Sequence, residues 1–372
     1  MYTNYTTLTD LLSSPLTATP TAVRLIDEFE PPVVYNWSLG AQRDVGFQLV
    51  ADVAYVGNTA RNNLITTQIN GRPYGYAYMP SSLDPTNVSG GQPQPYLDDL
   101  LRPYRGYGAI SRREFSGYSN YHSMQFAVNR RRTSDGLSFG AAYTYELVNK
   151  TLGTIDPFVA DNRARNYTSS GRRPHNLVIN YSYELPIFSQ RWDSLLTKIF
   201  LDNWQVSGVT SFISGTRGNF TYGYTGVPTG ALSGTGGITT TANNAAPSRV
   251  DIVCDPYLPI GERSFDRQFK TECIAAPADE FRLGNSRGDE FQGPGYMNWD
   301  ISFFKYVPMG GGRRLQLRVE LYNAFNSDQW TNTDTSAVFN YVTGEQTDTN
   351  FGKLTGATLS ARRVQLAARF TF

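Results

Sequence analysis

Two cysteines and two histidines are the side chains of this sequence best suited to covalent or metal chemistry. Cys254 and Cys273 lie in one polar, proline-rich segment, where a disulfide would close a short ring and contribute roughly 3 kcal/mol in an oxidising compartment. Two unrelated thiols are the alternative, because spacing alone does not bring two cysteines together. The pair therefore indicates a crosslinked loop without proving it.

The remaining candidates for chemistry do not cluster. His122 and His175 are far apart in the chain, so we expect them to be surface or lumen residues and not metal ligands. Asp251, Asp255 and Asp266 follow no calcium-loop spacing, and a solvated loop is the expected structure. The sequence contains no nucleophile elbow, phosphate loop or dinucleotide fingerprint. We expect no catalytic residue, no cofactor, no metal site and no enzymatic activity.

Composition favours strands and turns over helices. Of 372 residues, 13% are aromatic, 34 are glycine and only 17% are charged. The net charge of +1 and the scattered basic residues give no reason to expect nucleic acid binding. No apolar run approaches the length of about 18 residues that a spanning helix needs, and the mean hydropathy is −0.39. A β-barrel remains compatible, since only alternate residues of its strands are apolar.

The final segment, Arg362 to Phe372 (RRVQLAARFTF), shows this alternation most clearly. Val364, Leu366 and Phe370 fall on one face, and charged or polar residues fall on the other, which is the period of a strand. In a soluble sandwich the apolar face would point into a core. In an outer membrane barrel it would point into lipid, and the polar face would line the lumen.

The same alternation predicts nine long strands. They are expected at residues 33–42, 47–56, 118–130, 137–147, 175–185, 203–214, 297–307, 315–325 and 362–372. Connections after the first, third, fifth and seventh strands are short, and the other four are long. This asymmetry is typical of an antiparallel up-and-down transmembrane β-barrel with short periplasmic turns and long extracellular loops, and it favours that fold class over a sandwich. The ninth strand would then end in the periplasm.

Segments outside these strands are expected to be loop. Residues 1–30 are predicted to be an irregular lead-in, and 57–117 and 215–294 to be long insertions, the first with a short hairpin near Tyr107 to Phe115 and the second with a mobile run at 229–241. Strands of ten or more residues suit a bilayer better than a soluble sheet. Five aromatic residues near strand ends suit interfacial girdles, with ordinary core packing as the alternative: Trp37, Trp204, Trp299, Tyr183 and Phe372.

Several motifs, in order, resemble the C-terminal barrel of TonB-dependent receptors of the Oar-like type. They are Phe47 to Asn58, Arg173 to Leu177 (RPHNL), Gly261 to Phe269 (GERSFDRQF), Gly293 to Lys305 (GPGYMNWDISFFK) and Arg313 to Asn326 (RRLQLRVELYNAFN). The resemblance extends from about Val33 to the C-terminus. It also implies that the aromatic ending, Phe370 and Phe372, is the C-terminal signal that the barrel-assembly machinery recognises.

This resemblance implies a function and also a limit. Such receptors reside in the Gram-negative outer membrane and import a bulky extracellular ligand, powered by a TonB complex that pulls on an N-terminal plug. Residues 31–372 are expected to be the C-terminal part of such a barrel, with the plug, regulatory domain and signal peptide outside this sequence. We therefore expect a receptor fragment, embedded in lipid, that does not transport unaided.

Two other functions compete with import. A structural or adhesion protein would use the barrel to display its long loops, and a soluble β-rich hydrolase would need carboxylates clustered in a cleft. Coordinates that sealed Leu317, Val319, Leu366 and Phe370 beneath a second protein layer would contradict the barrel.

Overall fold

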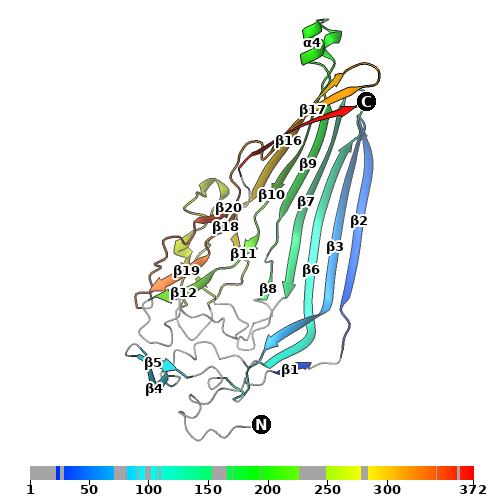
Figure 1. Ribbon diagram of the computed structural model, residues 1–372. Coiled ribbons are helices and arrows are strands. Elements are labelled where there is room, and N and C mark those ends of the chain that lie inside the picture. The colour runs from blue at the N-terminus through cyan, green and yellow to red at the C-terminus, as the bar shows by residue number, and fades with distance from the viewer. Residues whose placement is uncertain are drawn as a thin grey trace.

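The structure is a computed structural model in which nine long strands lie side by side (Figure 1). It describes residues 22–25, 29–70, 81, 83–89, 92–96, 102–105, 107–108, 110–152, 166–169, 171–192, 194–225, 249–277, 284–340, 342–357 and 361–372. Most of the predicted lead-in and the whole of the run at 229–241 lie outside these residues.

The nine predicted strands are confirmed, and they form one antiparallel sheet in chain order. They are β2 (Val33–Gly46), β3 (Leu49–Gln68), β6 (Ile110–Arg130), β7 (Leu137–Leu152), β9 (His175–Glu184), β10 (Trp204–Ile213), β16 (Tyr296–Pro308), β17 (Arg314–Tyr322) and β21 (Arg363–Thr371). Each strand pairs with the next along this path, so the sheet is up-and-down. In the described part of the chain, β2 and β21 are its two edges.

The predicted asymmetry of the connections is confirmed for three of the four pairs of strands expected to have short links. The links from β2 to β3, β6 to β7 and β16 to β17 are short, whereas the β9–β10 link spans residues 185–203 and is nearly as long as the β7–β9 link, residues 153–174. Figure 1 places the β16–β17 turn, the β9–β10 link and the C-terminus at one end of the sheet, which we call the turn end. The N-terminal part and the long connections lie at the other end.

The first turn differs from the prediction by a few residues. Arg43 to Gly46 was expected to be the connection, but β2 continues to Gly46 and the turn consists of Phe47 and Gln48, whose φ angles are 53° and 61°. Two successive positive φ angles are typical of the two-residue hairpin turn whose twist matches that of paired strands. Asp44 and Gly46 lie instead in an irregular step of the strand, where Gly46 N–H donates to Asp44 Oδ1 (2.8 Å).

The insertion predicted at 57–117 is wrong at both ends, because β3 and β6 run on through it as paired strands. Ile65 to Gln68 pair with Ser111 to Glu114, so the separate hairpin expected near Tyr107 to Phe115 does not form. The pairing register shifts between Ala60 and Asn63 and again before Ile65. These irregularities interrupt the period of two, which is why alternation did not reveal this part of either strand.

Part of the lead-in is also ordered. β1 (Ala22–Leu25) pairs in parallel with Ile110 to Arg113 of β6. The pairing of β6 with β7 ends at Ser119, so β7 does not reach Ile110 to Arg113. β1 pairs with β6 at these residues instead. β8 (Tyr167–Thr168) completes β7 in the same way, by pairing with Thr151 and Leu152.

Two long connections fold together into a small unit, which we call the cap (residues 217–225, 249–277, 284–292, 330–340 and 342–357). Its short elements are β11 (Arg217–Gly218), β12 (Thr221–Thr225), β13 (Asp251–Ile252), η5 (Ile260–Glu262), η6 (Thr271–Cys273), β14 (Ile274–Ala275), β15 (Phe291–Gln292), β18 (Trp330–Thr333), β19 (Ser336–Asn340) and β20 (Leu354–Ala357). β12 comes from the β10–β16 connection and pairs in parallel with β19 from the β17–β21 connection. The prediction of loop is therefore wrong for the described parts of both connections.

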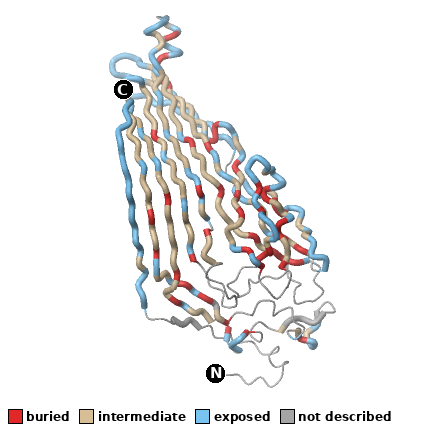
Figure 2. Tube along the Cα trace, turned by 180° about the vertical axis from the view of Figure 1, so that it is seen from behind, coloured by how far each residue is buried: buried red, intermediate tan, exposed pale blue. Residues whose placement is uncertain are grey.

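The main hydrophobic core lies in this cap and not in the sheet. Its buried members are Phe220, Tyr222, Tyr224, Val250, Phe269, Ile274, Phe291, Ala337, Phe339 and Phe351. Buried residues gather in the cap in Figure 2 and are scattered along the long strands. A smaller cluster of Ile65 and Leu152 lies where β3, β6 and β7 extend toward the long connections. Apart from this small cluster, the described residues of the sheet form no core of their own.

Four further short elements belong to the described connections. A hairpin of β4 (Leu83–Ser89) and β5 (Gln92–Pro95) belongs to the β3–β6 connection. The β9–β10 link contains η3 (Phe188–Gln190) and the short helix α4 (Leu195–Phe200). Within the described ranges, no helix has the length and apolar character needed to cross a membrane.

Candidate lipid-facing surface and polar inner face

The strand registers place the apolar residues of all nine strands on one face of the sheet. Directly paired residues point to the same side of a sheet, so the pairs can be followed from strand to strand. Leu366 of β21 pairs with Val319, which pairs with Phe303 of β16. Phe303 in turn pairs with Val206 of β10, and Val206 pairs with Tyr183 of β9. We call this side the apolar face.

No second protein layer covers the apolar face in the described structure. Leu317 is 42% exposed, Leu366 is 74% exposed and Phe370 is 50% exposed, and Val319 is half-buried by its neighbours on the sheet. The arrangement that would have contradicted the barrel is therefore not observed at these four positions. Leaving a broad apolar surface uncovered in water is unfavourable, at roughly 25 cal/mol for each Å². A hydrocarbon environment removes this penalty.

Three groups of aromatic rings lie on the apolar face, and together we call them the aromatic row. Within each group, contacting rings have centroids between 5.0 and 6.1 Å apart. The groups are Trp37, Tyr55 and His122; Phe126, Tyr143, Tyr145 and His175; and Phe212, Trp299 and Phe325. Aromatic side chains with a polar tip favour the boundary between hydrocarbon and water. The row therefore has the composition of an interfacial girdle.

The two histidines belong to this row. Tyr55 Oη and His122 Nδ1 are hydrogen-bonded at 2.6 Å, and Tyr143 Oη and His175 Nδ1 at 2.7 Å. The structure does not bring the two histidines together, and no group of three metal-binding side chains occurs among the described residues. Sequence reasoning missed their place in the girdle because each histidine meets its tyrosine only through strand pairing.

A second aromatic group lies near the turn end. Trp204 and Tyr183 are on the apolar face by register, and the rings of Phe370 and Phe372 stack with centroids 6.1 Å apart. Phe212 and Trp204 are eight positions apart in β10, which is about 26 Å of strand. With the tilt of about 35–45° that strands have in outer membrane barrels, this span covers about 20 Å of height, a large part of the apolar band of about 25 Å that aromatic girdles flank there.

Lys305 is the one predicted lumen-type charge that falls on the apolar face of β16. Its ammonium group is turned toward the turn end, where it donates to the carbonyl oxygen of Asp202 and lies 5.5 Å from the centre of the Trp204 ring. Only 7% of the residue is exposed. A lysine that would cost about 2–4 kcal/mol at the middle of a bilayer costs about 0–1 kcal/mol near its edge. Its position near a strand end therefore makes the charge tolerable.

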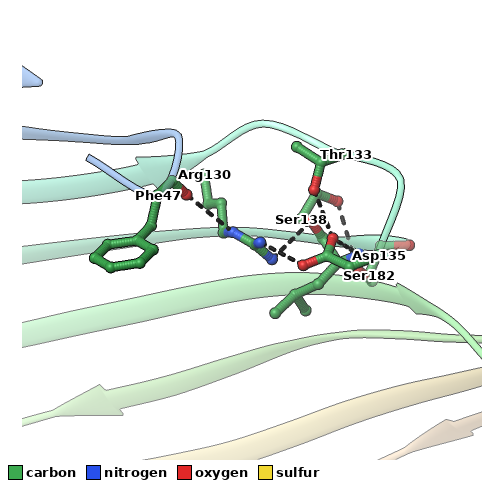
Figure 3. Close-up of polar contacts among 7 residues, drawn as sticks. Phe47, Arg130, Thr133, Asp135, Ser138 and Ser182 are labelled. Atoms are coloured by element: carbon green, nitrogen blue, oxygen red, sulfur yellow. Dashed lines mark hydrogen bonds and ion pairs between the residues drawn. The ribbon is translucent and has the colours of Figure 1, made fainter. Parts of the chain in front are cut away.

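Arg130 occupies a similar place at the end of β6 (Figure 3). Its guanidinium donates to the carbonyl oxygens of Phe47 (3.4 Å) and Leu137 (3.3 Å) and forms an ion pair with Asp135. The Thr133 hydroxyl donates to Asp135 Oδ1 at 2.6 Å. The hydrogen bond from Thr133, with that from Arg130, lowers the pKa of Asp135 to about 2. This network ties the β2–β3 and β6–β7 turns together.

The opposite face carries a continuous polar network, and we call it the polar face. Tyr306 Oη donates to Gln205 Oε1 (3.0 Å) and accepts from Gln316 Nε2 (3.2 Å). Gln205 Nε2 donates onward to Ser182 Oγ (2.8 Å), so hydrogen bonds cross β9, β10, β16 and β17. The Arg318 guanidinium lies 4.9 Å from the centre of the Phe304 ring on this face. Such a surface suits water or a polar occupant of a lumen.

A groove of about 930 Å³ opens beside the β21 edge, where polar-face residues meet Val364 and Leu366 of the apolar face. Its polar lining comes from three strands: Tyr296, Asn298, Asp300, Tyr322, Arg363 and Gln365. Asp300 Oδ1 accepts the Asn323 N–H (2.9 Å), whereas Asn298 Oδ1 is buried and has no hydrogen-bond partner. Sequence alternation predicts its polar character but not its depth.

Cys254 and Cys273 are joined by a disulfide within the cap, with Cα atoms 4.8 Å apart. Cys273 is buried at the end of η6, and its carbonyl oxygen accepts the Val253 N–H (3.0 Å). The bridge therefore closes a loop that carries η5 and lies against the cap core.

The acidic residues considered as calcium ligands are used separately. Asp251 Oδ1 accepts the Asn285 N–H (3.0 Å), and Asp255 Oδ1 accepts the Tyr257 N–H (3.0 Å). Asp266 Oδ1 is 3.5 Å from Lys353 Nζ. Each carboxylate thus fixes a different part of the cap.

The sequence matches a family profile described as outer membrane beta barrel domain over residues 2–365. A comparison with curated proteins found no match. Among solved structures, the outer membrane transporter YddB from Escherichia coli is 9% identical, with a TM-score of 0.42, and the match covers 93% of this chain and 34% of that one.

Two further solved structures show a similar level of likeness. The FrpB iron transporter from Neisseria meningitidis (F3-3 variant) is 10% identical, with a TM-score of 0.39. The match covers 93% of this chain and 32% of FrpB. The siderophore receptor PirA from Acinetobacter baumannii is 10% identical, with a TM-score of 0.39. The match covers 92% of this chain and 32% of PirA. The chain spans about a third of the length of these structures.

Proposed function

The chain belongs to the outer membrane beta barrel domain family, and on this premise we propose that it is the C-terminal barrel part of a TonB-dependent receptor. It lies in the Gram-negative outer membrane. The observation that carries the proposal is the register that aligns the apolar residues of nine strands and two aromatic groups on one uncovered face. The ordered motifs that resemble Oar-like receptors support the receptor class.

The proposed activity is energy-coupled import of a bulky extracellular ligand by the complete receptor. The polar face would line the lumen, the long connections would meet the ligand, and TonB would act through a plug that these residues do not form. The chain has no catalytic role in this proposal. The polar side chains of three strands that line the groove beside β21 support it.

A second candidate is the display of surface loops for adhesion, and the cap favours it. A cap with its own aromatic core and a disulfide presents a fixed surface outside the membrane. Such a surface would serve adhesion as well as ligand capture.

Retention by the periplasmic domain of TonB separates the two functions. The gene product that contains these residues is extracted from the host outer membrane and passed over immobilised TonB periplasmic domain. Import predicts retention, and an excess of free TonB domain should release the protein. Two results together would favour adhesion. The folded product would not be retained by TonB, and deletion of residues 249–277 would abolish attachment of the cells to a surface.

We also propose that Phe370 and Phe372 are read by the barrel-assembly machinery. Phe372 is 95% exposed and follows β21, whose residues are all exposed, so both rings are accessible to another protein. Deleting Phe372 should lower the amount of folded protein in the outer membrane several-fold, as measured by heat-modifiable migration on gels. Thr371→Ala, a change beside it, should leave that amount unaltered. Equal assembly of the deletion and the control would contradict the proposal.

A further inference from the structure

The link between β9 and β10 presents a compact group of uncovered apolar side chains at the turn end. Each member of the group is between 46% and 66% exposed. The members are Ile187, Trp192, Leu196, Ile199, Phe200 and Leu201. Figure 1 shows α4 standing beyond the ends of the long strands. An apolar group of this kind on a surface link indicates contact with something other than water.

The link is folded, so the exposure is not that of a frayed segment. The Ser189 N–H donates to Asp202 Oδ1 (3.0 Å), which ties η3 to a residue two positions before the start of β10. The Leu201 N–H donates to the Thr197 carbonyl oxygen (2.9 Å) and completes the last turn of α4. Hydrogen bonding from Ser189 lowers the pKa of Asp202, so this carboxylate remains ionised at neutral pH and holds the link closed.

The end of α4 is fastened to the apolar face of the sheet. The indole N–H of Trp204 donates to the Phe200 carbonyl oxygen (2.6 Å), and the Lys305 ammonium donates to the Asp202 carbonyl oxygen. Both Trp204 and Lys305 lie on the apolar face by register. The exposed apolar residues of the link therefore continue the surface that faces lipid.

The helix α4 is long enough to reach across the headgroup region of a bilayer. A six-residue helix is about 9 Å long, and the headgroup region adds about 5–7 Å on each side of the hydrocarbon core. Arg191 and Lys198 are exposed within the same link, where phosphate groups would meet them. Short amphipathic helices with apolar and basic side chains lie in this layer.

We propose that the β9–β10 link is an interfacial anchor that lies among the phospholipid headgroups of the periplasmic leaflet. This inference rests on the outer membrane barrel of the proposed function. The anchor fixes the depth of the turn end, with Leu196, Ile199 and Phe200 toward the acyl chains and the basic residues toward phosphate. Its ligand is phospholipid, and a periplasmic protein is the competing occupant.

Site-directed spin labelling measures this contact directly. The full chain is reconstituted in vesicles of phosphatidylethanolamine and phosphatidylglycerol, with Leu196→Cys or Ile199→Cys carrying a nitroxide. Both cysteines in the described structure are disulfide-bonded, so the added thiol is the one that reacts. Collision with oxygen reports lipid, and collision with a water-soluble nickel chelate reports water. Ser134→Cys, in the exposed β6–β7 turn, is the aqueous control, and Leu366→Cys on the apolar face is the lipid control.

The proposal predicts an oxygen-to-nickel collision ratio at 196 and 199 several-fold above that at 134. A ratio equal to that at 134 would overturn it, since the link would then lie in water. Labels at 196 and 199 that are shielded from both reagents would overturn it in favour of protein contact. If the label at 366 also has the low collision ratio of a residue in water, the apolar face does not contact lipid, and both the proposed function and the anchor are contradicted. If the label at 366 has the ratio of lipid and the labels at 196 and 199 do not, only the anchor is contradicted.

Discussion

At the scale of single residues, the position of the Trp37 ring depends on the side chain that Gly57 lacks. A Cβ atom on Gly57 would lie 2.2 Å from Trp37 Cε2, so the indole lies across the backbone of β3 where any other residue would exclude it. The ring is thereby held 5.7 Å from the His122 ring, within the aromatic row. One glycine thus contributes to the girdle without contacting lipid itself.

Replacing Gly57 should displace this ring. Gly57→Ala is expected to move the indole out of the row, lose an aromatic contact worth about 1 kcal/mol, and shift the tryptophan emission of the protein in vesicles. Gly40→Ala in the neighbouring strand β2 is the matched control, since its Cβ would meet Ala54 Cβ at an ordinary 3.4 Å. Equal emission spectra and equal midpoints of heat unfolding for the two variants would contradict this reading.

Asp135 should give the stability a distinctive dependence on pH. Its pKa is lowered from 3.8 to about 2 by hydrogen bonds from Thr133 and Arg130. A carboxyl whose pKa is lower in the folded state stabilises fully above pH 3.8, and that contribution disappears as the pH falls toward 2. The midpoint of unfolding of Asp135→Asn should therefore lie below that of the wild type at neutral pH and approach it in acid. Ser134→Ala should show no such convergence, and a pH-independent gap for Asp135→Asn would contradict the assignment.

At the scale of elements, the cap is a small folded unit attached to strands whose one buried cluster in the described structure, Ile65 and Leu152, is much smaller than the cap core. Its stability depends on packing between two connections that are distant in sequence and on one crosslink. The strands depend instead on pairing and on the solvent around them. Perturbations of the cap and of the sheet should therefore be separable.

The disulfide provides that separation. Replacing both cysteines by serine is expected to cost the cap roughly 3 kcal/mol by the chain-entropy estimate, and to accelerate protease cleavage between residues 254 and 273. Heat-modifiable migration of the sheet should stay unchanged. Thiol titration of the unfolded protein checks the bond itself: two thiols should appear after reduction, and two thiols without a reductant would contradict it.

The sequence predicts the sheet far better than the cap, for a physical reason. A strand with one apolar face repeats every two residues, so all nine were recognisable from Val33 onward. Bulges near Asn63 broke that period and concealed the extensions of β3 and β6. The cap residues, such as Phe220 and Phe339, have no period, because their core forms between short segments that meet only in three dimensions.

The candidate site divides in the same way. Apolar and polar faces followed from alternation, and strand-end aromatics such as Trp204 followed from the length of the strands. Lys305 was a local exception to the alternation, and its partner Asp202 lies in a link with no periodic signal. The groove near Asn298 needs three strands in register, which pairing supplies and sequence does not.

At the scale of the whole molecule, the sheet is open in the described part of the chain. β2 and β21 each have one edge whose backbone groups meet no strand. In hydrocarbon each unsatisfied group costs several kcal/mol, so spanning sheets close or pair with another sheet. The isolated chain is therefore expected to satisfy these edges by self-association.

Light scattering of the isolated chain in detergent tests this expectation. The protein mass, after subtraction of detergent, should exceed the 41.4 kDa of one chain. Under the proposed receptor function, adding the N-terminal part of the receptor should convert the associated species into a single larger complex. A monodisperse single chain with full strand content would show that the edges are satisfied in some other way.

The parallel pairing of β12 with β19 sets an order of events during biogenesis. Thr221 and Ser336 are 115 residues apart, and they meet only when both connections have crossed to the same side of the membrane. Pairings between such remote segments form late, after local hairpins. Until β19 arrives, Phe220 and its neighbours remain unshielded and open to surface proteases. Protease resistance of the cap therefore reports the end of assembly, because it develops only after the β17–β21 connection has reached the same side of the membrane as β12.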